Sequence, residues 1–280
     1  MKQMVFVAVV LLAAAVVSGQ AWEGDLLGME TGEVHGMVGA TWDSEWLWRG
    51  FPLYDNKSAT HVMADVNLFE TGFGMSAVWH RANSSGFENG ERLDYTFYYQ
   101  NGMFSGEPYA TNYRFGWVYY NYPDHSPDWY DLQEAQAVFS WPNLVPVKGL
   151  CPSYALVKLW PSTSSDGGSF IGSRRARGSA SGWLHILMLD YGFTVPGIIP
   201  EIPEHLIKLH GELVYNDGFH PYARNVDQDW SHAVFGASTD IDIVPNVTLT
   251  PAVYYQTTME KSVNPESDEL WVSVGLRYSF

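Results

Sequence analysis

The sequence of 280 residues predicts an all-β fold, an antiparallel transmembrane β-barrel. Three observations predict it. Apolar and polar residues alternate along about twelve segments of roughly nine to twelve residues, with almost no helical periodicity. Tight turns alternate with long polar connections. The chain also ends on an aromatic residue, Phe280, that closes an alternating segment. Together these features favour a barrel of about twelve strands in a bacterial outer membrane.

The alternation is clearest in the last segment. Its apolar residues, Val272, Val274, Leu276, Tyr278 and Phe280, alternate with Trp271, Ser273, Gly275, Arg277 and Ser279. Segments that begin at Leu93, Tyr113, Ile207 and Val247 follow the same rule. Successive side chains of a strand point to opposite faces, so each segment has one apolar and one more polar face. A soluble β-sandwich also alternates, so this pattern does not decide between the two folds.

Strand length and connection length separate the two folds. Strands of roughly nine to twelve tilted residues span a bilayer, whereas strands of soluble domains average about five or six. The connections at Glu70–Gly72 and Asp242–Asn246 are tight, while those at Ser162–Ser181 and Asp217–Asp229 are long and polar. Short turns on one side and long loops on the other are typical of outer-membrane barrels. Two proline-rich connections on the short side, Trp141–Pro152 and Pro196–Glu204, are expected to be longer.

The N-terminus has the pattern of a secretory signal peptide. Lys2 precedes the apolar run Val5–Val17 and the small-residue segment Ser18–Ala21. The run is shorter than the roughly 18 to 20 residues of a membrane-spanning helix, so we expect cleavage after Ala21. Residues 1–21 are then the signal peptide and residues 22–280 a single barrel, exported to a Gram-negative outer membrane. The net charge of −16 argues against nucleic acid as a partner, and the single Cys151 precludes an internal disulfide.

The last strand and the aromatic content indicate the partners of this barrel. Leu276, Tyr278 and Phe280 resemble the assembly signal of outer-membrane barrels, which implies the barrel assembly machinery as a partner. Aromatic residues make up 15% of the chain, and Trp and Tyr favour the interface between membrane and water. Outer-membrane lipid and lipopolysaccharide are therefore expected neighbours. Arg174, Arg175 and Arg177, in the long loop, could bind lipopolysaccharide phosphates or belong to a solvated loop.

Three segments of the first hundred residues carry a family resemblance: Asp43–Gly50, which contains Trp48-Arg49-Gly50, then Gly72–Trp79, and then Glu91–Tyr95. With the terminal strand, they resemble the TorF family of putative porins. That family has a W-R-G or F-R-G element after its first strand, then a G-F-Y-x-G-x-W hairpin and an acidic, Tyr-bearing strand. This chain departs from the pattern at Gly74, where the family tends to have an aromatic residue, and at Lys57–Ala59, where a proline is common. The resemblance implies a porin and no catalytic residues.

Polar residues on the predicted inner face are the candidate pore lining. They are Arg49, Asp65, Asp94, Arg114, Glu134, Lys208, His210, Glu212 and Arg277. For Arg49 two interpretations stay open. Its guanidinium could pair with Asp43 or Asp65 in the lumen and constrict it, or it could tie a loop to the barrel rim while Gly50 supplies the turn.

The sequence therefore predicts a small porin that passes small solutes or ions, with no cofactor. One alternative is a structural or adhesion barrel, in which the inner charges form ion pairs without transport. A lipid-acting barrel enzyme is less favoured, because His80 and Ser84 lie four residues apart on an extended strand, about 13 Å. The other histidines show no metal-ligand spacing, so we predict neither an enzyme nor a metal site. Net charge alone does not indicate ion selectivity, because most acids lie in the presumed external loops rather than in the wall, and a mild preference for cations is the most that is expected.

Overall fold

The computed structural model describes residues 34–162, 180–199, 202–221 and 226–280. Its strands are β1 (His35–Asp43), β2 (Leu47–Trp48), β3 (Phe51–Pro52), β4 (Ala59–Asn67), β5 (Phe73–Ala82), β6 (Arg92–Met103), β7 (Thr111–Asn121), β8 (Leu132–Ser140), β9 (Leu150–Pro161), β10 (Gly182–Ile199), β11 (Ile202–Asp217), β12 (Gln228–Thr239), β13 (Ile241–Val244), β14 (Val247–Thr258) and β15 (Glu269–Ser279). The expected signal peptide, residues 1–21, and Arg174, Arg175 and Arg177 lie outside the described residues.

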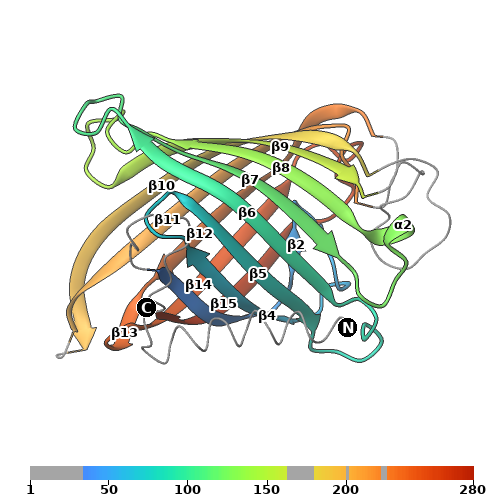
Figure 1. Cartoon of the computed structure of the whole chain (residues 1–280), viewed down its shortest axis with the longest axis horizontal. Coiled ribbons are helices and arrows are strands. Elements are labelled where there is room, and N and C mark those ends of the chain that lie inside the picture. Colours follow the sequence, from blue (N-terminus) through green and yellow to red (C-terminus); the bar gives the residue numbers. More distant parts are fainter. Residues whose placement is uncertain (1–33, 163–179, 200–201, 222–225) are drawn as a thin grey trace, which may run out of the picture.

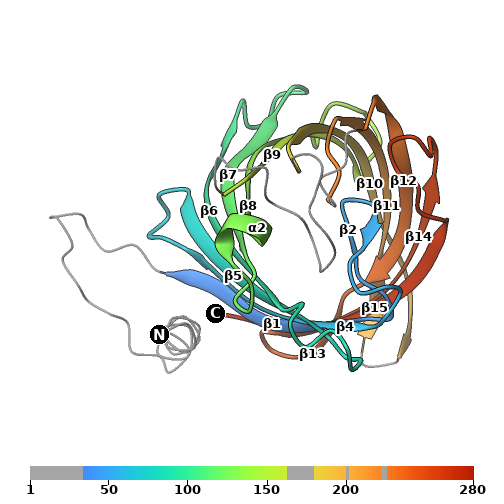
Figure 2. The same cartoon turned by 90° about the vertical axis from the view of Figure 1, so that its right-hand side faces the viewer.

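The strands close into an antiparallel barrel whose wall has twelve strand positions (Figures 1 and 2). Neighbours in sequence pair from β4 through β12, and β12 then pairs with β14. The short β13 also pairs with β14, so β12 and β13 together occupy one strand position in the wall. Pairing of β1 with β15 completes the ring. The predicted barrel of about twelve strands is confirmed, and its backbone groups are paired around the whole circumference.

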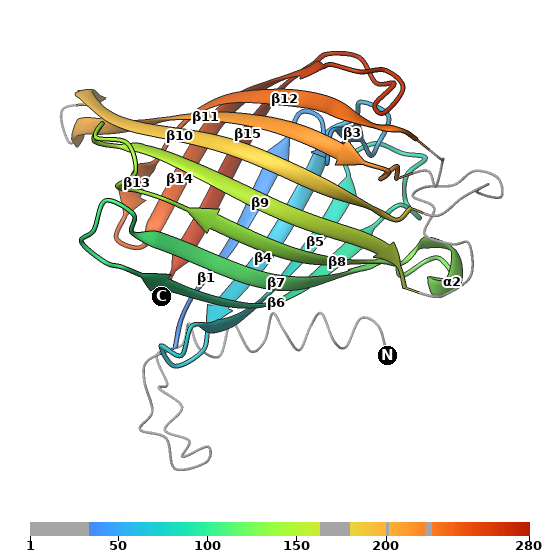
Figure 3. The ribbon, with the colours of Figure 1, turned by 90° about the horizontal axis from the view of Figure 1, so that it is seen from above.

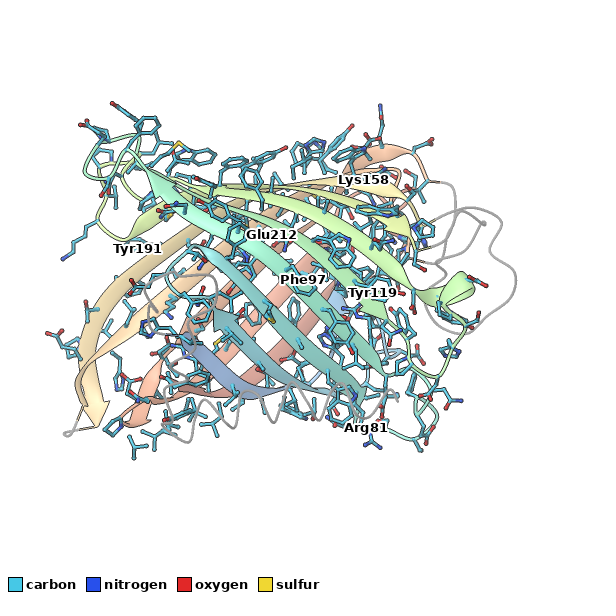
Figure 4. The ribbon with its side chains drawn as sticks, viewed as in Figure 1. Arg81, Phe97, Tyr119, Lys158, Tyr191 and Glu212 are labelled. Atoms are coloured by element: carbon cyan, nitrogen blue, oxygen red, sulfur yellow. The ribbon has the colours of Figure 1, made fainter. Side chains whose placement is uncertain are left out.

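The alternation of the sequence divides the wall into two faces. Phe97, Phe115 and Leu209 are exposed on the outer face, as are Val274 and Leu276 of the last strand. Figure 4 shows Phe97 projecting outward from β6. The residues between these outward positions face the barrel interior because successive side chains of a strand alternate. An outer face of exposed apolar side chains around a closed sheet is the surface that a bilayer solvates.

Connections of different length lie at the two ends of the barrel, with α2 (Pro127–Tyr130) and β13 at opposite ends (Figure 3). The end with the connections 68–72, 104–110, 141–149 and 245–246 is the turn side. The end with 44–58, 83–91, 122–131 and 259–268 is the loop side. The expectation of a long connection at Pro196–Glu204 is wrong: Pro196 pairs with Glu204, and β10 and β11 have 18 and 16 residues. No helix in the described residues is long and apolar enough to cross a bilayer.

Candidate functional site

A short hairpin folds from the loop side into the barrel interior. Trp48 of β2 pairs with Phe51 of β3, and the turn between them has positive φ at Arg49 (55°) and Gly50 (88°). Figure 2, which looks along the barrel, shows β2 inside the ring of wall strands. We call residues 46–54 the inner hairpin. Its Phe51 and Tyr54 side chains are completely buried, so the hairpin is part of a packed interior rather than an open loop.

The tip of the inner hairpin is held by two separate parts of the barrel wall. An Nη atom of Arg49 donates to Oε1 of Glu134 in β8 at 2.6 Å, and the Glu134 carboxylate is almost fully buried. The Gly50 carbonyl accepts hydrogen bonds from Nε2 of Gln256 in β14 at 3.0 Å and from Nδ2 of Asn264 at 3.1 Å. The hairpin therefore reaches across the interior from the β1–β4 connection to β8, and it also contacts β14 and the β14–β15 loop.

Gly50 is required at this tip for two reasons. Its φ of 88° lies in a region that residues with a Cβ rarely adopt. A Cβ at this position would also overlap the ring of His232 in β12, which is itself buried. The glycine thus allows the hairpin backbone to contact the barrel wall directly.

A buried arginine binds the base of the inner hairpin to the wall. The Arg92 guanidinium of β6 lies 4.6 Å from the ring centroids of both Trp46 and Trp48, and 4.7 Å from that of Tyr120. Its Nε donates to Oδ1 of Asp94 at 2.7 Å. Cation–π contacts and a charge-assisted hydrogen bond stabilise this buried cation, and its Nη1 has no hydrogen-bond partner in the described structure. Inward-facing apolar residues complete the packing: Val118, Leu132, Val157, Leu159, Leu184, Ile186 and Val214.

A row of histidines and carboxylates continues this interior across β1, β4, β5 and β6. Asp43 Oδ2 lies 3.1 Å from His61 Nε2, and His61 Nδ1 lies 2.7 Å from His80 Nδ1. His80 Nε2 in turn lies 3.0 Å from Asp94 Oδ2, and the Trp46 ring stacks on His80 at 4.4 Å. In the part of the chain that the structure describes, no group of three or more such side chains is placed to hold a metal ion. The row instead contacts the inner hairpin, through the stacking of Trp46 on His80.

The turn-side part of the interior is lined by charged and amide side chains. Lys208 and Arg277 both contact Oδ2 of Asp240, at 2.6 and 3.1 Å. His210 Nδ1 lies 2.7 Å from Oδ1 of Asp190. The interior is thus tightly packed around the inner hairpin on the loop side, with buried charged pairs, and lined by polar and charged groups on the turn side.

The predicted lining residues share one face. The strand registers and the outward exposure of their neighbours place Asp65, Asp94, Arg114, Glu134, Lys208, His210, Glu212 and Arg277 on the inner wall, and Arg49 at the hairpin tip inside it. They do not form one cluster, because Arg49, Glu134 and Asp94 belong to the packed loop-side interior. Glu212 lies 3.9 Å from the buried His232, and the others line the wall toward the turn side. A role of these residues in conduction stays a prediction.

The interpretation that paired Arg49 with Asp43 or Asp65 is wrong. Asp43 contacts His61, Asp65 accepts a hydrogen bond from the Tyr98 hydroxyl at 2.8 Å, and Arg49 pairs with Glu134. The inward fold of the hairpin carries Arg49 past the nearby strands to β8. Arg49 does anchor a loop through charge-assisted hydrogen bonding, but inside the barrel rather than at its rim.

Two features of the interior had no clear sequence signal. Arg92 follows Glu91 at a predicted strand start and gave no indication of burial. Ser231 Oγ lies 2.9 Å from Nδ1 of His232, because an irregularity opposite Val214 and Tyr215 in β11 turns both side chains inward. A serine beside a histidine suggests nucleophilic chemistry, but both residues are at most 1% exposed beneath Gly50, so a substrate has no access to them.

At the loop side, Glu45 is a titratable group with an unusual environment. It is 7% exposed and shares a hydrogen bond with the carboxylate of Glu269, and its Oε1 has no partner in the described structure. Burial, and then the charge of Glu269, raise the pKa of Glu45 from 4.5 to about 7. The folded protein therefore retains this proton at pH values where the unfolded chain has lost it.

We expect the wild-type protein to become less stable relative to Glu45→Gln as the pH rises from 4.5 to about 7, because only the wild type must keep the Glu45 proton when it folds. A raised carboxyl pKa favours folding most at low pH, and the glutamine amide can still donate to Glu269. Unfolding free energies of the two proteins in lipid vesicles should agree near pH 4.5 and differ by up to about 3 kcal/mol at about pH 8, with the glutamine variant more stable. A difference that is independent of pH would contradict the shared proton.

Comparisons with known proteins support the fold. A KdgM porin in complex with disordered oligogalacturonate has a TM-score of 0.51 at 11% identity, over 88% of this chain and 99% of that chain. A second KdgM porin structure has a TM-score of 0.50 at 10% identity with the same coverage. These similarities show a shared β-barrel fold. No family model and no curated protein matches the sequence, so the TorF resemblance is not confirmed.

Proposed function

We propose that this chain is an outer-membrane channel for small solutes or ions, narrowed by the inner hairpin. The observation that carries the proposal is the division of the interior. Its turn side is lined by polar and charged groups, as a water-filled passage requires, while the inner hairpin occupies part of the cross-section on the loop side. The exposed apolar outer face and the expected signal peptide support an outer-membrane location. Neither feature indicates an enzyme.

A second candidate, a structural barrel without transport, is favoured by one observation. The inner hairpin packs on apolar wall residues and leaves Phe51 and Tyr54 with no exposed surface. A barrel that never conducts would keep this packing permanently. A channel needs either a path beside the hairpin or a hairpin that moves. Single-channel recording of the refolded protein in planar bilayers distinguishes the two candidates, because only a channel produces discrete current steps.

Replacing Arg49 by alanine is expected to increase the conductance or the open probability several-fold. The change removes the bond to Glu134 and leaves a buried carboxylate without its partner, which costs about 3 to 5 kcal/mol at such sites. Water and ions can relieve that cost only if the hairpin tip moves from the wall. The measurement is the current of each refolded variant in a planar bilayer.

Arg81→Ala is the matched control for this experiment. Arg81 also pairs with a glutamate, Glu91 at 3.4 Å, but its side chain is 52% exposed and lies on the outer face. Its loss should leave the current unchanged. If the wild type and Arg49→Ala are both silent although correctly folded, the chain is a structural barrel. If Arg49→Ala conducts like the wild type, the hairpin does not narrow the passage.

A further inference from the structure

One cavity lies at the turn side of the barrel, outside the packed interior around the inner hairpin. It has a volume of about 520 Å³ and opens among β4, β6, β7 and β8. Inward side chains around it are Asn67, Gln100, Asn112, Arg114, Val138 and Ser140. This volume lies within the range of small-ligand sites, and its lining combines one cation with several hydrogen-bonding groups.

Arg114 is the unusual member of this lining. Arg92 and Arg277, the other inward arginines of the strands, each contact a carboxylate, and so does Arg49 of the hairpin. Among the described residues, Arg114 has no carboxylate within 4.0 Å. Its guanidinium carbon lies over the Tyr98 ring, 3.7 Å from the centroid.

The atoms of Arg114 divide by their surroundings. Its Nε is buried without a hydrogen-bond partner in the described structure, whereas its two terminal nitrogens are neither buried nor hydrogen-bonded there. Tyr98 is itself fixed, because its hydroxyl donates to Oδ1 of Asp65 at 2.8 Å. The guanidinium is thus held in place with its terminal edge open to the cavity. A planar pair of donors in this arrangement matches the two oxygens of a carboxylate.

Amide groups beside Arg114 add a second kind of recognition. Gln100 Nε2 donates to Oδ1 of Asn67 at 3.1 Å, which leaves the Gln100 carbonyl oxygen as an acceptor. Asn112 and Ser140 line the same cavity. Such groups bind hydroxyls, which a hydroxylated solute presents. The one acid of the lining, Glu70, is exposed in the β4–β5 turn, where solvent screens its charge.

We propose that Arg114 and the adjoining amides form a binding site for a small carboxylate-bearing, polyhydroxylated solute at the turn side of the barrel. The inference deepens the proposed channel function, on which it rests for the route by which such a solute enters. The carboxylate binds the terminal nitrogens of Arg114, while the Tyr98 ring contacts one face of the guanidinium. The amides then select for hydroxyl groups.

Calorimetric titration of the detergent-refolded barrel with D-glucuronate and D-glucose tests the site without any need for conduction. The two sugars differ in a carboxylate against a hydroxymethyl group. We expect glucuronate to bind at least about tenfold more tightly than glucose, and Arg114→Gln to weaken glucuronate binding at least about tenfold. Arg277→Gln is the matched control, since Arg277 is also an inward arginine at the turn side but is paired with Asp240.

Each outcome decides the proposal. Loss of glucuronate binding in Arg114→Gln but not in Arg277→Gln supports it. Absence of glucuronate binding, equal affinity for both sugars, or equal losses in the two variants would overturn it. Current steps without glucuronate binding would contradict the proposed binding site but support the proposed channel function. Glucuronate binding to a barrel that never conducts would support the binding site but contradict the channel function.

Discussion

Deleting Tyr278–Phe280 is expected to abolish assembly of the barrel in the membrane while leaving export intact. The terminal residue closes the ring: Gly36 donates to the Phe280 carbonyl at 2.9 Å, and the Phe280 amide donates to the Gly36 carbonyl at 3.0 Å. Ser279 also donates to the Asn246 carbonyl at 2.9 Å. Without these residues, backbone groups of β1 and β14 face lipid unpaired, at several kcal/mol each. The measurement is the amount of heat-modifiable protein in the outer-membrane fraction.

A deletion of equal length in the β6–β7 turn provides the control. Residues 105–107 are exposed and lie outside the strands, so their removal leaves every pairing at the β1–β15 seam in place. This variant should assemble. Normal levels of heat-modifiable protein after deletion of the last three residues would show that the terminal strand is dispensable, contrary to the assembly role assigned to Leu276, Tyr278 and Phe280.

The second large effect concerns the two faces of β11. Leu209 is 41% exposed on the outer face of β11, so Leu209→Arg places a charge in the lipid. We expect it to lower the unfolding free energy in lipid vesicles by about 1 to 4 kcal/mol, since the cost of an arginine on the lipid face is greatest at the bilayer midplane and falls toward the interfaces. The measurement is denaturant unfolding of the refolded protein.

His210→Arg, one position along, is the matched substitution. His210 faces inward and contacts the carboxylates of Asp190 and Glu212, which can pair with the new guanidinium. Its cost should remain below about 1 kcal/mol, and its effect should instead be seen in the ion preference of the channel. Equal penalties, or a larger one at His210, would show that β11 does not present Leu209 to lipid.

Both predictions depend on a property that is local in sequence. The period of two in segments such as Ile207–Tyr215 assigns each residue to one face, whatever the rest of the chain does. That period gives the approximate strand count and the inward facing of the candidate lining residues. It also indicates at which end of the barrel the tight turns and the long loops lie. Even so, the prolines at Pro196 and Pro203 indicated a loop where β10 and β11 extend. Pairing between the two strands extends beyond Pro196 to Ile199 and Ile202.

The sequence by itself therefore determined the barrel and the facing of its wall, because alternation and turn chemistry act between near neighbours. Only the tertiary structure decided what the interior contains. Arg49 meets Glu134 across 85 positions of sequence, and Gly50 meets Gln256 across 206. Such contacts arise when closure of the ring brings distant strands to face one another. Whether a charge inside the barrel is paired with a carboxylate, as at Arg49, or lies over an aromatic ring, as at Arg114, depends on which strands closure places opposite it.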